Sequence, residues 1–221
     1  MLGLGVGIVL VCLLFAFIGV VIFREAFTHR FWQRKVDEGD LEMITQLVQI
    51  EVQRWRTERP PKGMAASVWQ GIQNVELVDV DPEYVRASTT AEPQFALVAG
   101  ERRQVSSAID EAKRVTAKLA ERFFYDIPHI RPARVQIDCY TTVQDGGVAS
   151  QRCIMTTVAN RAEAAQVDWD TDPSDVIAER LGARYQIDRQ GVPQEIAPDD
   201  PRIRVSTNGS HNGKSVAPDL R

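Results

Sequence analysis

The sequence contains few of the residues that usually carry chemistry, with three cysteines, three histidines and 7% aromatic residues. Its cysteines form no Cys-x-x-Cys pair and no Cys/His cluster, so neither a zinc motif nor a disulfide framework is predicted. Walker A and Gly-x-Gly-x-x-Gly sequences are absent, which excludes the two common phosphate-binding loops. The net charge is −4, whereas broad nucleic-acid binding needs a concentrated positive charge. We therefore expect no cofactor, no metal site and no nucleic-acid partner.

The N-terminus, in contrast, is a long apolar run. Residues 2–23 contain no charged side chain. A helix over this run would be roughly 33 Å long, close to the hydrocarbon thickness of about 30 Å. No basic segment precedes the run and no Ala-x-Ala cleavage site follows it, which argues against a removed signal peptide. The sequence therefore predicts a single-pass transmembrane anchor at residues 1–23.

Basic and aromatic residues follow this run. Because lysine and arginine collect on the cytoplasmic side of membranes, the soluble part is predicted to lie in the cytoplasm. Aromatic rings favour the membrane interface, and basic side chains reach lipid phosphates, so membrane lipids are expected partners. A stop-transfer flank with an aromatic belt explains the same residues without specific lipid binding. The predicted membrane-interface residues are Arg24, Phe27, Arg30, Phe31, Trp32, Arg34 and Lys35.

Hydrophobic periodicity and turn residues predict an α+β domain behind the anchor. Apolar spacing predicts helices at 41–58, 65–71, 102–124 and 172–181, and β-forming residues predict strands at 75–80, 84–90, 95–99, 133–143 and 183–188. A capping box at Ser107 and Asp110 would move the start of the third helix to residue 107. The simplest arrangement is a small antiparallel sheet of two hairpins packed by helices. We divide the chain into a transmembrane anchor at 1–23, a juxtamembrane helical stalk at 24–63, a soluble α+β domain at 64–188 and a disordered tail at 189–221.

The second hairpin is predicted in most detail. Asp145-Gly146-Gly147 is expected to form a three-residue loop, with Gly147 in the left-handed conformation. This register places residue 144 opposite 148 and Cys139 opposite Cys153. Both cysteines are then expected to be buried, reduced and unreactive.

Two groups of residues are candidate chemical sites. Asp168, Asp170, Asp172 and Glu179 have the spacing of calcium ligands in an EF-hand, but Pro173 stands where that loop needs glycine. A turn followed by a capped helix explains the same residues. Asp126, His129 and Cys139 could form a nucleophilic set only if the thiol lay beside a base.

Two functions remain open from the sequence. The first is a membrane-tethered, non-enzymatic binding or scaffold domain with a protein partner, acting as a subunit of a larger membrane assembly. The alternative is an enzyme at the membrane surface that uses carboxylates in a cleft, with Asp126, Asp138 and Asp168 as the first candidates.

Overall fold

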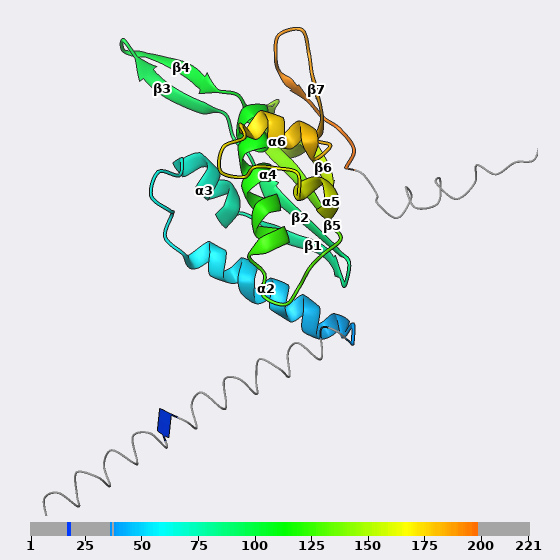
Figure 1. Cartoon of the computed structure of the whole chain (residues 1–221). Coiled ribbons are helices and arrows are strands. Elements are labelled where there is room, and N and C mark those ends of the chain that lie inside the picture. The colour runs from blue at the N-terminus through cyan, green and yellow to red at the C-terminus, as the bar shows by residue number, and fades with distance from the viewer. Residues whose placement is uncertain (1–16, 19–35, 37, 199–221) are drawn as a thin grey trace, which may run out of the picture.

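The computed structural model describes residues 17–18, 36 and 38–198; the rest of the chain lies outside the described residues. The domain is α+β, with runs of helices followed by runs of strands (Figure 1). The elements are α2 (Leu41–Thr57), α3 (Ala66–Gln73), β1 (Glu76–Asp81), β2 (Tyr84–Thr90), β3 (Gln94–Val98), β4 (Glu101–Ser106), α4 (Ala108–Tyr125), β5 (Arg134–Asp145), β6 (Val148–Asn160), α5 (Arg161–Ala164), α6 (Ser174–Arg180), β7 (Arg184–Ile187) and β8 (Pro193–Gln194).

The main sheet is mixed, so the predicted antiparallel sheet is wrong. Six strands lie in the order β1-β2-β5-β6-β7-β8, and β2 pairs with β5 in parallel. The cause is the crossover through α4, because a helical connection returns the chain to the same end of the sheet. Strands β3 and β4 form a separate two-stranded sheet within that crossover.

The predicted transmembrane helix also needs correction. Among the described residues, no helix is long and apolar enough to cross a membrane. The longest of them, α4 with 18 residues, carries charged side chains along one side, as an amphipathic surface helix does. Within the predicted anchor only Phe17 and Ile18 are described. The seven predicted membrane-interface residues, Arg24, Phe27, Arg30, Phe31, Trp32, Arg34 and Lys35, all lie outside the described residues.

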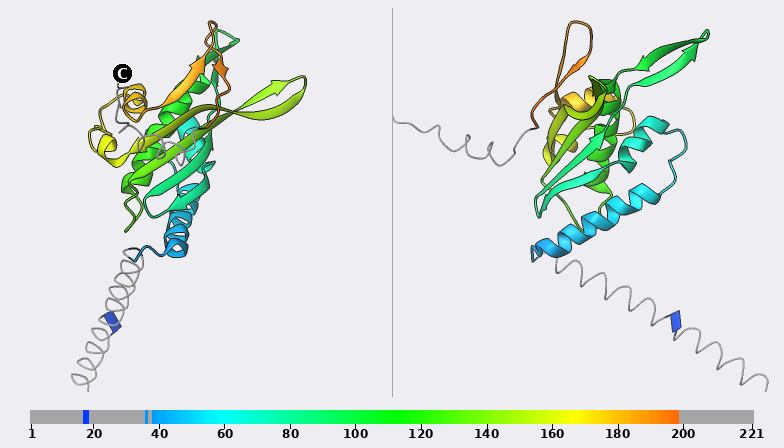
Figure 2. Two further views of the ribbon diagram at one scale, coloured as in Figure 1. Left: turned by 90° about the vertical axis from the view of Figure 1, so that its right-hand side faces the viewer. Right: turned by 180° about the vertical axis from the view of Figure 1, so that it is seen from behind.

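Helices cover one face of the main sheet (Figure 2). Helix α4 lies across β5 and β6 and buries Ala112, Val115, Leu119 and Phe123. Helix α3 approaches α4 closely at Gly71, where a β-carbon would lie 2.6 Å from a methyl of Val115. A larger residue at this position would therefore push the two helices apart.

Helix α2 belongs to the same core, although the sequence assigned it to a stalk. Its buried face carries Ile44, Val48, Val52 and Trp55. The Trp55 ring meets Phe123 of α4 edge to face, with the ring centres 5.1 Å apart. Aromatic pairs in this geometry contribute about 0.5–1.5 kcal/mol beyond simple burial.

Side chains cap the starts of two helices, and the predicted capping box at Ser107 is confirmed. The Asp40 carboxylate accepts the backbone N–H of Met43 at 3.2 Å. At α4, the Ser107 hydroxyl accepts the N–H of Asp110 at 3.1 Å, and the Asp110 carboxylate accepts the N–H of Ser107. Each arrangement satisfies donors that a helix start leaves unpaired.

The predicted register of the β5–β6 hairpin is wrong by one residue at the turn. Asp145 pairs with Val148, because Gly146 and Gly147 both adopt positive φ values, 58° and 88°, and form a two-residue turn. A bulge farther along β6 shifts the register again. Cys139 therefore lies opposite Met155, and Cys153 lies opposite Tyr140.

The chain after β7 stays at the edge of the main sheet. Strand β8 pairs with β7, and the N–H of Ile196 donates to the carbonyl of Cys153 at 2.9 Å. The first residues of the segment predicted as a tail thus contact the sheet, while residues 199–221 lie outside the described residues.

Candidate functional site

The β3–β4 hairpin stands away from the main sheet (Figures 1 and 2). It exposes large apolar side chains: 79% of Leu97, 59% of Val105 and 45% of Phe95 are accessible to solvent. A two-stranded hairpin without packing on either face is at best marginally stable in water. These side chains therefore contribute little to the fold, and their exposure indicates an interaction surface.

One face of the hairpin combines apolar and cationic groups. Phe95 pairs with Gln104 and Leu97 pairs with Arg102, so these four side chains share a face. The Arg102 guanidinium lies 4.3 Å from the centre of the Phe95 ring. We call Phe95, Leu97 and Arg102 the hairpin patch. An aromatic ring, an aliphatic side chain and an arginine on one face are typical of protein-binding surfaces.

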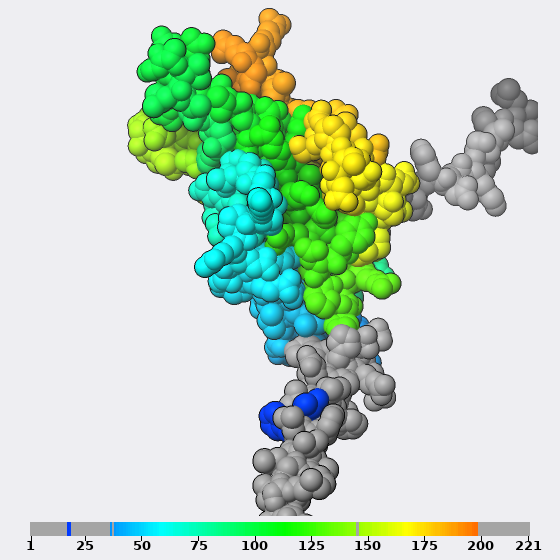
Figure 3. All heavy atoms as spheres, turned by 60° about the vertical axis from the view of Figure 1, so that its left-hand side comes forward, coloured from blue at the N-terminus to red at the C-terminus, as the bar shows by residue number. Residues whose placement is uncertain are grey.

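The base of the hairpin is tied to the main sheet by Glu92. Its carboxylate accepts the backbone N–H of Thr142 at 2.9 Å and the hydroxyl of Thr141 at 3.0 Å. This contact sets the direction of the hairpin relative to β5. Figure 3 shows the hairpin and the tip of the β5–β6 hairpin projecting at the same end of the molecule, with α2 at the other end.

The face of the main sheet opposite α4 holds a buried polar network around Asp138. Its carboxylate accepts hydrogen bonds from Arg86 at 2.8 Å, from Gln136 at 2.9 Å and from the Thr156 hydroxyl at 2.6 Å. The side-chain oxygen of Gln136 in turn accepts a hydrogen bond from the Tyr84 hydroxyl at 2.8 Å. Burial raises the pKa of Tyr84, so the hydroxyl keeps its proton. The Asp138 carboxylate therefore accepts hydrogen bonds from three side chains and stabilises the fold.

The structure brings together two of the three candidate catalytic carboxylates. Asp126 and Asp168 line one shallow groove of about 610 Å³, beside Tyr125 and Trp169. Burial raises the pKa of Asp126. Hydrogen bonds from Thr171 lower the pKa of Asp168. Asp138 belongs to the network on the sheet face opposite α4 and does not line this groove.

The EF-hand spacing corresponds to a turn. The Asp168 carboxylate accepts the backbone N–H groups of Asp170 and Thr171, both at 3.2 Å. Asp172 pairs with Arg180 at 2.8 Å. In residues 17–18, 36 and 38–198, no group of three metal-binding side chains is found.

Neither described cysteine is an activated nucleophile. Cys139 is buried beside the Thr116 hydroxyl at 3.2 Å, and burial raises the pKa of its thiol to about 12. Burial likewise raises the pKa of Cys153 to about 11. The hydrogen-bond partners of Cys139 are Thr116 and the carbonyl of Ala112, so the set with Asp126 and His129 does not form. The predicted buried, free thiols are confirmed.

Sequence reasoning missed the hairpin patch. The sequence predicts a helix from residue 102, or from 107 if the capping box marks its start; the later start is correct, and residues 102–106 belong to β4. The available signal was Ala99-Gly100 between two β-forming runs; both residues adopt positive φ, 53° and 85°, as a two-residue hairpin turn requires.

Comparison of the chain with known proteins gives no match to a protein family, to a curated protein or to a solved structure. Its function is therefore inferred from the geometry of its own residues.

Proposed function

We propose that this domain is a non-enzymatic protein-binding or scaffold module that holds its partner through the hairpin patch. The exposure of Leu97 beside Phe95 carries this proposal. An apolar surface kept in water gains free energy when a partner covers it, at roughly 25 cal/mol per Å² of apolar area. Since the fold itself leaves this area exposed, a partner is the simplest way to bury it.

The shape and chemistry of the hairpin support a protein as that partner. A projecting two-stranded hairpin presents its side chains outward and encloses no volume for a small ligand. Among residues 38–198, its two strands pair only with each other, so their outer backbone edges can pair with a strand of a partner. Arg102 adds positive charge beside the apolar residues, whereas Arg103 lies on the other face of the hairpin and pairs with Glu101 at 3.1 Å.

The proposal is tested by purification of tagged, full-length protein in mild detergent from the cells that make it. We compare the natural chain with a Phe95→Ser/Leu97→Ser variant. The matched control is Val148→Ser at the tip of the β5–β6 hairpin, where 70% of the side chain is exposed. We expect the natural chain and the control to retain the same stoichiometric partner, and the double variant to lose it. Retention of that partner by the double variant would rule out the hairpin patch.

Membrane attachment and a cytoplasmic position stay predictions from the composition of residues 2–35. Nearly all of these residues lie outside the described part of the chain. Extraction of cell membranes with carbonate tests attachment, because an integral anchor resists it and a peripheral contact does not. Replacement of Arg30, Arg34 and Lys35 by glutamate tests whether those charges orient the chain.

The groove lined by Asp126 and Asp168 supports a second candidate function, which is an enzyme that uses carboxylates. Its supporting observation is that Asp126 and Asp168 line the same groove, where burial raises the pKa of Asp126 and hydrogen bonds from Thr171 lower that of Asp168. The same purification separates the two functions. A monomer without a stoichiometric partner would favour the enzyme and would direct the next experiments to Asp126→Asn and Asp168→Asn.

A further inference from the structure

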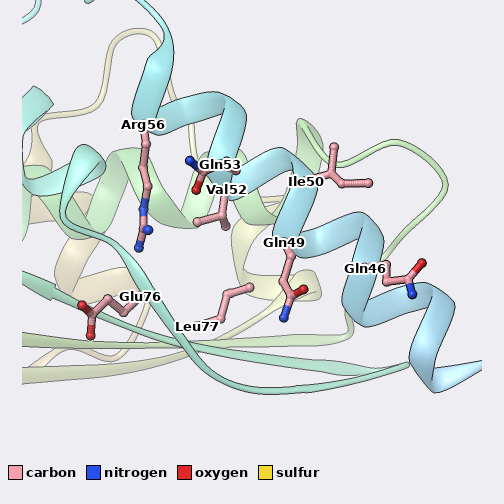
Figure 4. A pocket seen from close by; sticks show the side chains of 8 residues that line it. All are labelled: Gln46, Gln49, Ile50, Val52, Gln53, Arg56, Glu76 and Leu77. Atoms are coloured by element: carbon pink, nitrogen blue, oxygen red, sulfur yellow. The ribbon is translucent and has the colours of Figure 1, made fainter.

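Within residues 38–198, the two sheets have four edge strands, and three of these carry features that discourage pairing with another chain. Strand β1 contains three acidic residues, and it lies beside α2. In Figure 4, Gln49 and Val52 of α2 and Leu77 of β1 point into the space between the helix and the strand. Strand β8 is only two residues long and begins with a proline, and three of the six residues of β4 are charged. Charges, prolines, short strands and covering helices are the usual means by which proteins protect sheet edges.

Strand β3 lacks all of these features. Its five residues include no charged residue and no proline. In the part of the chain that the structure describes, β3 pairs only with β4. Its apolar side chains are exposed on both faces, with Phe95 and Leu97 on one face and Val98 on the other. An exposed, uncharged and apolar edge strand is a template for pairing with another strand.

The turn after β3 determines which backbone groups face this open edge. It is a two-residue turn, and it places Val98 opposite Glu101. Residues that flank such a turn exchange backbone hydrogen bonds, and along an antiparallel pair they alternate with residues whose N–H and C=O groups point outward. Counted back from Val98, Phe95 and Leu97 therefore direct their N–H and C=O groups to the outer side of β3. Pro93 precedes the strand and has no N–H, so pairing at this edge is confined to β3 itself.

A second copy of β3 fits this edge. In an antiparallel pair about a two-fold axis, Ala96 lies opposite Ala96 of the second copy. Phe95 then lies opposite Leu97 of the second copy, and Gln94 lies opposite Val98. This register pairs all five residues of the strand, and its hydrogen-bonded positions are those of Phe95 and Leu97. It brings no two charged residues of the paired strands opposite each other, so β3 is complementary to itself.

The number of strands also favours a second copy. A two-stranded hairpin is marginally stable, whereas three or more strands with a hydrophobic face are stable. Two hairpins joined through β3 make a four-stranded sheet, in which Phe95 and Leu97 of both copies form one continuous apolar face. The outer edges of this sheet are the two β4 strands, whose charged residues discourage further addition. The assembly therefore closes at two copies.

We propose that β3 of a second copy of this chain adds, antiparallel, to the outer edge of β3 and joins the two hairpins into one four-stranded sheet. The interface uses the backbone edge of β3 and leaves the face of the hairpin patch open. It therefore goes beyond the proposed function and does not rest on it. The dimer places two hairpin patches side by side, so a protein that binds this face meets both copies.

Cysteine cross-linking of the full-length protein in mild detergent tests the pairing. Every variant carries Cys12→Ser, so the introduced thiol is accompanied only by the buried Cys139 and Cys153. We expect mild oxidation of Ala96→Cys to give a disulfide-linked dimer, because facing residues at such a position have α-carbons about 4.5 Å apart. Val98→Cys is the matched control, since its counterpart lies four residues farther along the pair, about 14 Å away, and should give at least about tenfold less product. Equal yields, or no product from Ala96→Cys, would overturn the proposal.

The same register predicts a link between different positions. One tagged copy carries Gln94→Cys and a differently tagged copy carries Val98→Cys. We expect oxidation of the co-expressed copies to join the two tags, at a yield at least about tenfold above that of either variant with itself. No excess of the mixed product would overturn the antiparallel register.

Sedimentation of the full-length protein measures the association without a cross-link. Ala96→Lys places two like charges opposite each other, which destabilises a strand pair, and should weaken self-association at least about tenfold. Val148→Lys adds the same charge to the other hairpin and should leave association unchanged. Far-UV circular dichroism checks that both variants fold. Unchanged association of Ala96→Lys would overturn the proposal. Because Ala96 lies on the face opposite the hairpin patch, Ala96→Lys should still retain the protein partner, so failure of the dimer is distinguishable from failure of the patch.

Discussion

The two hairpins of this domain, β5–β6 and β3–β4, contain similar residues and differ in their surroundings. The inner half of β5–β6 lies between β2 and β7 and packs under α4, so Ile137 and Met155 are fully buried. Within the described part of the chain, β3 and β4 pair only with each other and Leu97 is exposed. The comparison teaches that apolar side chains on a hairpin stabilise the fold when other elements cover them, as in β5–β6, and stay exposed when none does, as in β3–β4.

The largest effect is expected in the polar network of β5. Asp138→Ala removes the acceptor shared by Arg86, Gln136 and Thr156 and leaves a partly buried arginine unpaired. Breaking one side of such a buried pair costs about 3–5 kcal/mol. Urea unfolding of the full-length protein measures this cost. As a control, Asp170→Ala at an exposed position should change it by less than about 0.5 kcal/mol. A cost for Asp138→Ala below about 1 kcal/mol would show that the network is dispensable.

A smaller loss is expected at the apolar face of the same strand. Ile137→Ala opens a cavity beneath α4 and should lower the free energy of unfolding by about 3 kcal/mol. The matched control is Ile187→Ala in β7, because that isoleucine is exposed. Equal losses at the two isoleucines would break the comparison between buried and exposed apolar residues.

Cys139 and Cys153, both in the β5–β6 hairpin, make the stability of that hairpin dependent on pH. Their thiols have pKa values raised from 9.0 to about 12 at Cys139 and about 11 at Cys153. The folded state therefore keeps protons that the unfolded state releases above pH 9, so stability should fall between about pH 9 and 12. Alkylation at neutral pH should run at least about a hundredfold slower than for a free thiol, because the thiolate is the reactive form. Rapid labelling of either thiol in the folded protein would contradict its burial.

The smallest effect on stability is expected in the hairpin patch. Leu97→Ser should change the free energy of unfolding by less than about 0.5 kcal/mol, since the side chain has no packing to lose. Thermal and urea unfolding measure this difference. Leu119→Ser in the buried face of α4 is the matched control and should cost several times more. A loss above about 1 kcal/mol at Leu97 would mean that the hairpin packs on the domain.

Local signals explain how much of the fold could be predicted. Asp40 and the Ser107–Asp110 box mark helix starts because a cap is formed within four residues. The parallel pairing of β2 with β5 could not be predicted, since it depends on where α4 returns the chain. The predicted pairing of Cys139 failed because the two-residue turn shifts the register by one residue and a bulge in β6 shifts it again.

The candidate site was harder to predict than the fold. Residues 95–99 were recognised as β-forming, but a period-two pattern does not tell whether the strand joins the sheet or stands away from it. The three acidic candidates were chosen by residue type alone. Asp138 proved to be a buried acceptor, whereas Asp126 and Asp168 share a groove through contacts between distant segments.

Photo-cross-linking in the cells that make the protein tests the role of the hairpin patch most directly. A photoreactive amino acid is placed at Leu97 in one chain and at Val148, also exposed on a hairpin, in another. We predict one discrete protein adduct from position 97, absent when Phe95→Ser is added, and no such adduct from position 148. The same adduct from both positions, or an adduct at 97 that persists with Phe95→Ser, would contradict the assignment of the β3–β4 hairpin as the partner-binding element.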